Sequence, residues 1–270
     1  MLTTLTGATR IYVILGDPIA QVKAPNGVTG AFAAAGHDAV LVPIHVAPAD
    51  VDAFVVALGP TKNVDGMLVT VPHKFAAYKH CTTASERSKA LEATNILRRN
   101  RDGTWHGDML DGPGFVKGIR LAGHEPGRKR ALLVGAGGAG SAMALELLRS
   151  GVSELAIHDN DVGRRERLLD RLRTQGFAHV CVGSADPTGF DLIVNATPSG
   201  MRGDDTLPVQ VDKLRPAMFV GDVITVPEVT PLLVAARRVG CRTSTGVNMF
   251  NAELDLQLDF FLAANRAARG

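Results

Sequence analysis

The sequence predicts an α/β protein of two domains. Strand-like and helix-like stretches alternate along nearly the whole chain, which is typical of parallel or mixed sheets covered by helices. A chain of 270 residues is long enough to form two compact domains. The glycine-rich stretch 135–140 follows the apolar run 131–134 and precedes a helical pattern over 141–148. In this context G-x-G-x-x-G indicates a phosphate-binding turn.

The first half of the chain is expected to form an α/β substrate domain. An apolar run stopped by Gly16-Asp17-Pro18 predicts its first strand, and Asp102-Gly103 predicts the turn of a β-hairpin. The expected strands are 11–15, 40–44, 66–71 and the hairpin within 95–106; the expected helices are 26–35, 50–58, a helix from Pro72, and 111–122.

The second half is expected to form a Rossmann nucleotide-binding domain, followed by a last helix that returns to the first domain. The amphipathic stretch 247–268 predicts that helix. We expect a substrate domain of residues 1–111 plus 245–270 and a nucleotide domain of residues 112–244, with a cleft between them. The expected strands of the nucleotide domain are 131–134, 155–158, 179–182, 191–195 and 218–222, with further helices at 164–174 and 230–238.

The glycine loop carries the cofactor prediction. Gly135 allows the tight turn, Gly137 lets a pyrophosphate approach the backbone, and Gly140 permits close packing of helix on strand. Gly138 and Ala139 lie at the start of the helix, where free amides and the positive helix end attract phosphate.

The choice between NAD and NADP depends on the end of the next strand, about 20 residues after the glycines. Asp159 stands there and can accept hydrogen bonds from both ribose hydroxyls, which favours NAD. Arg164 and Arg165 follow, and an arginine there can accommodate a 2′-phosphate, so NADP remains the alternative. The favoured interpretation of Arg164 and Arg165 is that they belong, with Arg167, to a solvated helix face.

Lys74 is a candidate catalytic residue because it follows a strand and stands at a helix start. A helix N-terminus disfavours positive charge, so a lysine there is unusual. A proton-transfer role would explain it. On this evidence alone, a surface lysine after the turn at Pro72 is the favoured interpretation.

Composition and charge argue against several functional classes. The formal net charge of +2 does not favour binding to nucleic acid or to an anionic membrane. The three widely spaced cysteines show no disulfide framework, so a cytoplasmic protein is expected. We find neither a signal peptide nor a run of about 18 apolar residues. The three cysteines and the eight histidines have no metal-ligand spacing, so no metal site is expected.

A series of motifs in order makes the chain resemble the shikimate dehydrogenase family, including its quinate/shikimate and aminoshikimate relatives. The resemblance runs from about Gly16 to Glu253. The motifs are Gly16-Asp17-Pro18-Ile19, residues 66–74, Glu92-Ala93-Thr94-Asn95, residues 107–114, residues 191–201 and Thr230-Pro231-Leu232-Leu233.

This resemblance implies roles for individual residues. Lys74 matches the family's catalytic lysine, and Asp111 matches the aspartate paired with it across the substrate. Such a pair can move the hydroxyl proton when a secondary alcohol is oxidised. Thr70 and Asn95 match polar residues that bind ring hydroxyls.

The resemblance also implies a loop beside the nicotinamide at residues 195–201. Thr197 and Met201 would contact the cofactor there, and Gly246 matches a family position on the cofactor side. The alternatives are that Asn195 only caps a strand end and that Met201 belongs to the core.

Departures from the family pattern cluster where the substrate carboxylate should bind. The family normally carries two serines at the positions of Val22 and Ala24, and neither of these side chains can donate a hydrogen bond. Each charged hydrogen bond lost costs a carboxylate about 1.5–3 kcal/mol. Lys23 is the candidate replacement, and Glu253 stands where the family has a substrate-binding glutamine. Further departures are Leu68, His73, Met109, Leu110 and Thr225.

These observations predict an NAD(P)-dependent alcohol dehydrogenase that acts on a ring hydroxyl of a shikimate- or quinate-like compound, with an altered substrate site. The alternative is a catalytically silent sensor of a nucleotide or metabolite on the same fold. The expected partner is a small polyhydroxylated ring, with neither nucleic acid nor membrane involved, and the expected oligomeric state is a monomer or a homodimer.

Overall fold

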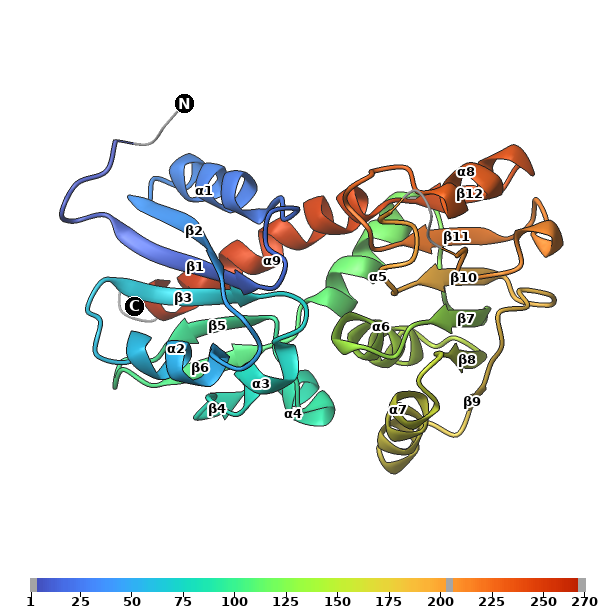
Figure 1. The fold of residues 1–270 in the computed structure, drawn as a ribbon, viewed down its shortest axis with the longest axis horizontal. Coiled ribbons are helices and arrows are strands. Elements are labelled where there is room, and N and C mark those ends of the chain that lie inside the picture. The colour runs from blue at the N-terminus through green and yellow to red at the C-terminus, as the bar shows by residue number, and fades with distance from the viewer. Residues whose placement is uncertain (1–3, 203–205, 267–270) are drawn as a thin grey trace. The chain divides into compact units, whose positions relative to one another are not determined.

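The computed structural model describes residues 4–202 and 206–266, which form two compact units (Figure 1). Unit 1 comprises the residues up to Leu110 together with those from Leu254 onward, and unit 2 comprises Asp111–Glu253. Asp111 and residues 245–253, which the sequence analysis places in the substrate domain, group with unit 2 in this division.

Unit 1 is built on a mixed sheet in the order β2-β1-β3-β5-β6-β4. The first three strands in this order are parallel, whereas β5 is antiparallel to both β3 and β6. The expected hairpin is therefore β5–β6, and Gly103 in its turn has a φ of +87°, which favours glycine. The strands are β1 (Arg10–Gly16), β2 (Ala39–His45), β3 (Val64–Val69), β4 (Thr83–Ala84), β5 (Ile96–Arg99) and β6 (Trp105–Asp108).

The two faces of this sheet carry different helices, because neighbouring residues of a strand point to opposite faces. Tyr12 of β1 packs on Phe32 of α1 and on Phe261 of α9, with ring centroids 4.5 and 4.6 Å apart. Val13 and Leu15 belong to a separate core cluster with residues of α2 and α3. These helices are α1 (Ala24–Ala34), α2 (Val51–Leu58), α3 (Lys74–Tyr78) and α9 (Gly246–Arg266), and α4 (Glu86–Leu91) precedes β5.

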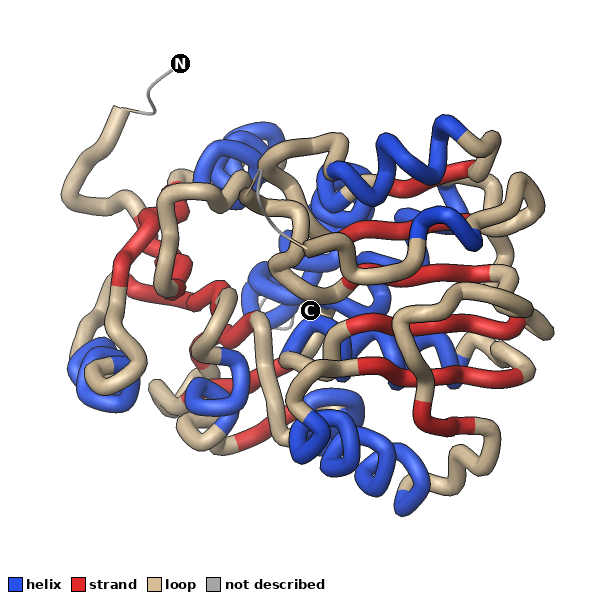
Figure 2. The backbone as a smooth tube through the Cα atoms, turned by 45° about the vertical axis from the view of Figure 1, so that its right-hand side comes forward, coloured by secondary structure: helices blue, strands red, loops and turns tan. Residues whose placement is uncertain are grey.

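Unit 2 is a parallel sheet in the order β12-β11-β10-β7-β8-β9, and Figure 2 shows its strands side by side. This is the doubly wound order in which ligands bind at the carboxyl ends of the strands. The strands are β7 (Arg130–Val134), β8 (Glu154–His158), β9 (Val180–Val182), β10 (Leu192–Asn195), β11 (Phe219–Asp222) and β12 (Arg242–Ser244).

Helices cover both faces of the second sheet. Val220 packs with Leu232 and Leu233 of α8 in one core cluster. On the other face, a Cβ at Gly221 would lie 2.9 Å from the ring of Phe115 in α5. The helices of unit 2 are α5 (Asp111–Leu121), α6 (Gly138–Arg149), α7 (Val162–Thr174), the 3₁₀ turn η1 (Val211–Lys213) and α8 (Pro231–Arg238), together with the first turns of α9.

The fold class predicted from the sequence is confirmed, with four elements that the sequence analysis did not expect. These are the short strand β4, helix α4, the 3₁₀ turn η1 and the edge strand β12. Ser85 caps α4 by accepting a hydrogen bond from the Ser88 amide, a helix-start signal that was available in the sequence. None of the helices in the described ranges is long and apolar enough to cross a membrane.

Candidate active site

The glycine loop between β7 and α6 has the backbone geometry that its sequence predicts. Gly135 has a φ of +103°, a conformation that side chains rarely adopt. A Cβ at position 140 would overlap the carbonyl oxygen of Gly135, so close packing of α6 requires glycine there. A Cβ at position 137, by contrast, would have no atom within 4 Å. The loop is closely packed at Gly135 and Gly140, and it is open at Gly137.

The first turn of α6 offers amides for an anion at this opening. The helix begins at Gly138, and its N-cap Gly137 provides no side-chain hydrogen bond. Ala139 follows in the first turn, where backbone amides have no partner within the helix. Amides and helix dipole together suit a phosphate group. The loop therefore fits the pyrophosphate of a dinucleotide.

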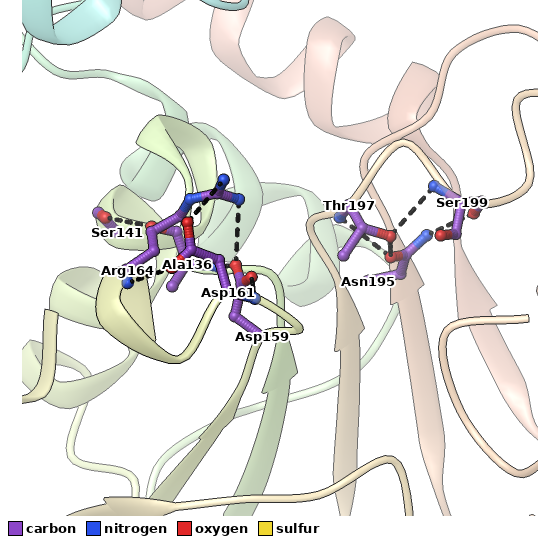
Figure 3. Close-up of polar contacts among 8 residues, drawn as sticks. All are labelled: Ala136, Ser141, Asp159, Asp161, Arg164, Asn195, Thr197 and Ser199. Atoms are coloured by element: carbon purple, nitrogen blue, oxygen red, sulfur yellow. Dashed lines mark hydrogen bonds and ion pairs between the residues drawn. The ribbon is translucent and has the colours of Figure 1, made fainter. Parts of the chain in front are cut away.

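Asp159 fastens the glycine loop to the end of β8 (Figure 3). It is only 8% exposed, and its Oδ2 accepts a hydrogen bond of 2.7 Å from the Ala136 amide. Its Oδ1 accepts one of 2.8 Å from the Asp161 amide. Each carboxylate oxygen has a second lone pair, so these bonds leave acceptor capacity for a ribose hydroxyl. Ribose binding by Asp159 stays a prediction.

Arg164 is in the first turn of α7, and its side chain lies between two carboxylates. Its Nη1 is 3.4 Å from Asp159 Oδ2, and its Nη2 is 3.4 Å from Asp161 Oδ2. Arg165 pairs instead with Glu166 at 2.7 Å. The sequence analysis did not name Asp161, although an aspartate before a helical stretch is a typical N-cap signal.

The loop that the resemblance placed beside the nicotinamide begins at Asn195, at the carboxyl end of β10. The Oδ1 of Asn195 accepts hydrogen bonds from the amide and the hydroxyl of Thr197, at 3.0 and 2.6 Å. Its Nδ2 donates to the carbonyl oxygen of Ser199 at 3.2 Å (Figure 3). Met201 further along is 37% exposed. The hydrogen bonds of the Asn195 side chain thus hold the conformation of residues 195–199.

Asp222 supports the same loop from β11, and the sequence analysis missed it. It is 1% exposed, and its Oδ2 accepts from Asn195 Nδ2 at 3.2 Å and from the Thr230 hydroxyl at 2.7 Å. Burial raises the pKa of Asp222, and the hydrogen bonds it accepts partly offset that rise. Thr230 also caps α8. One buried carboxylate therefore joins the loop that begins at Asn195 to the start of α8.

Gly246 is the first residue of α9. A Cβ there would overlap the carbonyl oxygens of Val223 and Ile224, just after β11. Only glycine allows α9 to begin against this segment.

Lys74 is buried at the first position of α3. Its exposed fraction is 6%, and its carbonyl oxygen accepts a hydrogen bond of 3.0 Å from the Thr94 amide. The preceding His73 is 1% exposed and donates from Nε2 to the carbonyl oxygen of Val46 at 2.7 Å. His73 therefore anchors the start of α3 to the segment after β2.

Thr70 and Asn95 are held by backbone hydrogen bonds in unit 1. The Thr70 amide donates to the carbonyl oxygen of Leu15 at 2.8 Å, which places Thr70 at the carboxyl ends of β1 and β3. Asn95 is 5% exposed, and its Oδ1 accepts from the Leu110 amide at 2.7 Å. Asn95 thus fixes the chain just before Asp111.

A partly buried ion pair supports the same segment, and sequence reasoning missed it. Asp108 accepts hydrogen bonds from Arg87 Nε at 2.7 Å, from the Ser85 hydroxyl and from the Met109 amide. Burial alone would raise the pKa of Asp108, but the bonds from Arg87 and Ser85 outweigh it, so the pKa lies below its usual value.

Asp111 and Glu253 are two buried carboxylates of unit 2, each 5% exposed. Asp111 begins α5, where the helix dipole favours negative charge. A Cβ at Gly114 in the first turn of α5 would lie 2.8 Å from the Cβ of Glu253. Glu253 thus packs against the first turn of α5. The pairing of Asp111 with Lys74, which belongs to unit 1, stays a prediction.

The segment expected to hold a carboxylate precedes and opens α1. Lys23 is the exposed N-cap of α1 and makes no side-chain cap hydrogen bond. Val22 is half-buried and Ala24 is 6% exposed. The substrate contact of Lys23 stays a prediction. Across the described parts of the chain, no group of three His, Cys, Asp or Glu residues is placed to hold a metal ion.

Comparisons with known proteins agree with this arrangement. Residues 14–97 match the family model for the shikimate dehydrogenase substrate-binding domain. A shikimate dehydrogenase (NADP⁺) of Rubrobacter xylanophilus is 36% identical over 248 residues, which cover 90% of this chain and 87% of that protein.

Two solved structures of enzymes have the same fold. A quinate dehydrogenase from Corynebacterium glutamicum in complex with NAD has a TM-score of 0.84 and 27% identity and covers 94% of each chain. A 5-ketofructose reductase of Gluconobacter sp. strain CHM43 has a TM-score of 0.83 and 25% identity and covers 96% of this chain and 94% of that one. On the extent and identity of these matches, the chain belongs to the shikimate dehydrogenase family and is an NAD(P)-dependent oxidoreductase.

Proposed function

We propose that the chain transfers a hydride reversibly between the nicotinamide of NAD(P) and a hydroxyl-bearing ring carbon of a shikimate- or quinate-like compound, with Lys74 and Asp111 handling the proton. The observation that carries this proposal is the burial of Lys74 at the first residue of α3. A buried lysine at a helix start is unusual, and a role in proton transfer accounts for its presence.

Oxidation of an alcohol requires that its carbon loses a hydride and its oxygen loses a proton. The bound nicotinamide supplies the hydride acceptor. Lys74 Nζ, in its neutral form, takes the hydroxyl proton, and as an ammonium it returns that proton in the reverse reaction. The Asp111 carboxylate accepts a hydrogen bond from the same hydroxyl and orients it. Thr70 and Asn95 bind further ring hydroxyls, and Lys23 and Glu253 are the other candidate substrate-binding residues.

Exchange of Lys74 for methionine tests this assignment, because methionine keeps most of the apolar stem and removes the ammonium. We expect kcat to fall at least about 100-fold, in line with the usual contribution of a general acid–base. The Kd for the nucleotide should stay unchanged. Lys79→Met is the matched control, since Lys79 is exposed at the other end of the same helix. Wild-type turnover in Lys74→Met would refute the role of Lys74.

The same measurements separate the enzyme from a silent sensor. A sensor would bind NAD or NADP and produce no NAD(P)H with any ring alcohol. The enzyme would show turnover in the wild-type protein and lose it in Lys74→Met while still binding the nucleotide.

A neutral polyhydroxylated ketone is a second candidate substrate, favoured by the segment that opens α1. Neither Val22 nor Ala24 offers a donor for a carboxylate, and the related 5-ketofructose reductase is named for a substrate without one. A panel of shikimate, quinate and 5-ketofructose decides between the two classes. Turnover of shikimate or quinate supports the first, and turnover of 5-ketofructose alone supports the second.

A further inference from the structure

The position of Lys74 depends on contacts outside its own helix. Helix α3 has only five residues, and a helix this short is marginal without tertiary contacts. Lys74 is its first residue, where a backbone amide has no acceptor within the helix. The hydrogen bonds that other segments of unit 1 make with His73 and Lys74 therefore hold the start of α3 in place.

Three hydrogen bonds connect residues 73 and 74 to neighbouring segments of unit 1. The His73 amide donates to the carbonyl oxygen of Thr70 at 3.0 Å, just after β3. The Thr94 amide donates to the carbonyl oxygen of Lys74 at 3.0 Å, just before β5. The third bond is made by a side chain, since His73 Nε2 donates to the carbonyl oxygen of Val46 at 2.7 Å. A substitution at position 73 can thus remove the third bond and leave the other two.

Val46 lies in a well-packed part of unit 1, directly after β2. It is 6% exposed, and its amide donates to the carbonyl oxygen of Gly16 at 3.2 Å, at the end of β1. Its side chain belongs to the core cluster that also contains Val69 of β3 and Ala77 of α3. The bond from His73 therefore connects the start of α3 to the carboxyl edge of the sheet.

The imidazole of His73 is committed to this bond. A carbonyl oxygen can only accept a hydrogen bond, so Nε2 of His73 carries the hydrogen. The residue is 1% exposed and has almost no surface to offer a substrate. Any effect of His73 on the reaction must therefore pass through the residues that it holds.

We propose that His73 is a positioning residue of the reaction, because its hydrogen bond to Val46 holds Lys74 where the lysine can exchange a proton with the substrate hydroxyl. The inference rests on the proposed function and deepens it, since that function assigns the proton to Lys74. Proton transfer requires the two groups to lie within hydrogen-bond reach, and a displacement of about 1 Å can slow a reaction about 100-fold. Without the bond from His73, the start of α3 would shift, and Lys74 would shift with it.

The test compares the steady-state kinetics of the wild-type protein with those of His73→Leu and His73→Gln. Leucine has nearly the volume of histidine but no donor, whereas glutamine can place its amide nitrogen close to the position of Nε2. The substrate is whichever of shikimate, quinate and 5-ketofructose the wild-type protein turns over. Each kcat is divided by the number of NAD⁺ or NADP⁺ sites that titration calorimetry finds, so that unfolded protein is not counted.

We expect His73→Leu to lower kcat per site at least about tenfold. The KM of the ring substrate and the Kd of the nucleotide should change less than about threefold, because the interaction acts on the reacting step. His73→Gln should restore kcat to within about threefold of the wild-type value. A role in stability alone would lower the free energy of unfolding and leave kcat per site unchanged.

His80→Leu is the matched control. His80 follows the other end of α3, and its Nε2 lies 2.8 Å from Asp52 Oδ1 of α2. This exchange also removes a histidine that connects α3 to a neighbouring segment, but it leaves the bond between His73 and Val46 intact. It should keep the wild-type kcat.

The outcomes separate the inference from the proposed function. If His73→Leu keeps the wild-type kcat per site, or if His73→Gln is as slow as His73→Leu, the positioning role is wrong and the dehydrogenase proposal stands. If His73→Leu does not fold, His73→Asn takes its place, because its shorter amide cannot reach Val46 and the same loss is expected. If Lys74→Met keeps the wild-type kcat, or if the wild-type protein turns over none of the three compounds, the proposed function fails and the inference fails with it.

Discussion

Replacement of Gly137 by alanine is the sharpest test of the cofactor loop, because the structure separates its effect on binding from its effect on folding. A Cβ at this position would meet no atom within 4 Å, so the added methyl group clashes with nothing in the protein. The backbone there, with φ −73° and ψ −170°, is extended and open to alanine. The methyl group would instead occupy the opening before the first amides of α6.

The expected change in folding stability is small because two effects oppose each other. Replacing glycine where the backbone permits it stabilises by about 0.4–1 kcal/mol through the unfolded chain. Alanine is a poorer N-cap than glycine, at a cost of about 0.5–1 kcal/mol. The free energy of unfolding should therefore change by less than about 1 kcal/mol. Loss of one charged hydrogen bond to the pyrophosphate costs about 1.5–3 kcal/mol, which raises the Kd about 10- to 150-fold.

The assay is titration of NAD⁺ followed by calorimetry, combined with urea unfolding in the absence of nucleotide. Gly30→Ala is the matched control: a Cβ there also meets no atom, but the residue is exposed in α1 of unit 1. It should raise stability by about 1 kcal/mol and leave the Kd unchanged. A Gly137→Ala protein with wild-type affinity for NAD⁺ would refute the assignment of this loop to the pyrophosphate.

Two predictions concern stability in unit 2. His124 is 5% exposed, its ring stacks on that of Phe219 with centroids 4.6 Å apart, and its Nε2 has no hydrogen-bond partner. Burial lowers the pKa of His124 to about 4, and the positive charges of Arg242 and Lys129 contribute to this shift. Between about pH 4 and 6.5 the unfolded chain therefore binds more protons at this histidine than the folded protein does. The contribution of His124 to the free energy of unfolding is complete above about pH 6.5 and falls by up to about 3 kcal/mol as the pH drops through that range. Urea unfolding at several pH values should show this loss as the difference between wild type and His124→Leu, and parallel pH profiles would contradict it. Thr230→Ala removes both the cap of α8 and the 2.7 Å bond to Asp222, so it should lower the free energy of unfolding by about 2–3 kcal/mol. Thr230→Ser keeps both bonds and should lose about 1 kcal/mol at most; an equal loss in the two variants would show that the bonds are unimportant.

The parts of the protein that the sequence predicted well are those whose signals are local. The glycine loop and its helix lie within a few consecutive residues, and the turn at Gly103 follows from a single dipeptide. The alternation of strands and helices predicted both sheets, because each strand is an apolar run bounded by turn residues. The two-residue strand β4 and the polar edge strand β12 lack such runs, so propensity could not reveal them.

The supporting residues of the site were harder to predict because their roles depend on contacts between distant positions. Asp222 joins Asn195 and Thr230, which are 27 and 8 residues away. Asp108 meets Arg87 across 21 residues. Nothing adjacent to either aspartate indicates these partners. Asp161 is the exception, since its place before α7 marked it as an N-cap and only its ion pair with Arg164 needed the structure.

The site also explains how a member of this family could keep its reaction and change its substrate. Lys74 and Asp111 are both buried at the first residue of a helix, so exchange of either disturbs packing as well as chemistry. Lys23, in contrast, is exposed and caps no helix amide with its side chain, so its exchange costs the fold little. Substitutions accumulate most easily where they are cheap for folding. The proposed proton-transfer residues should therefore persist, whereas Lys23 can be exchanged as the substrate changes.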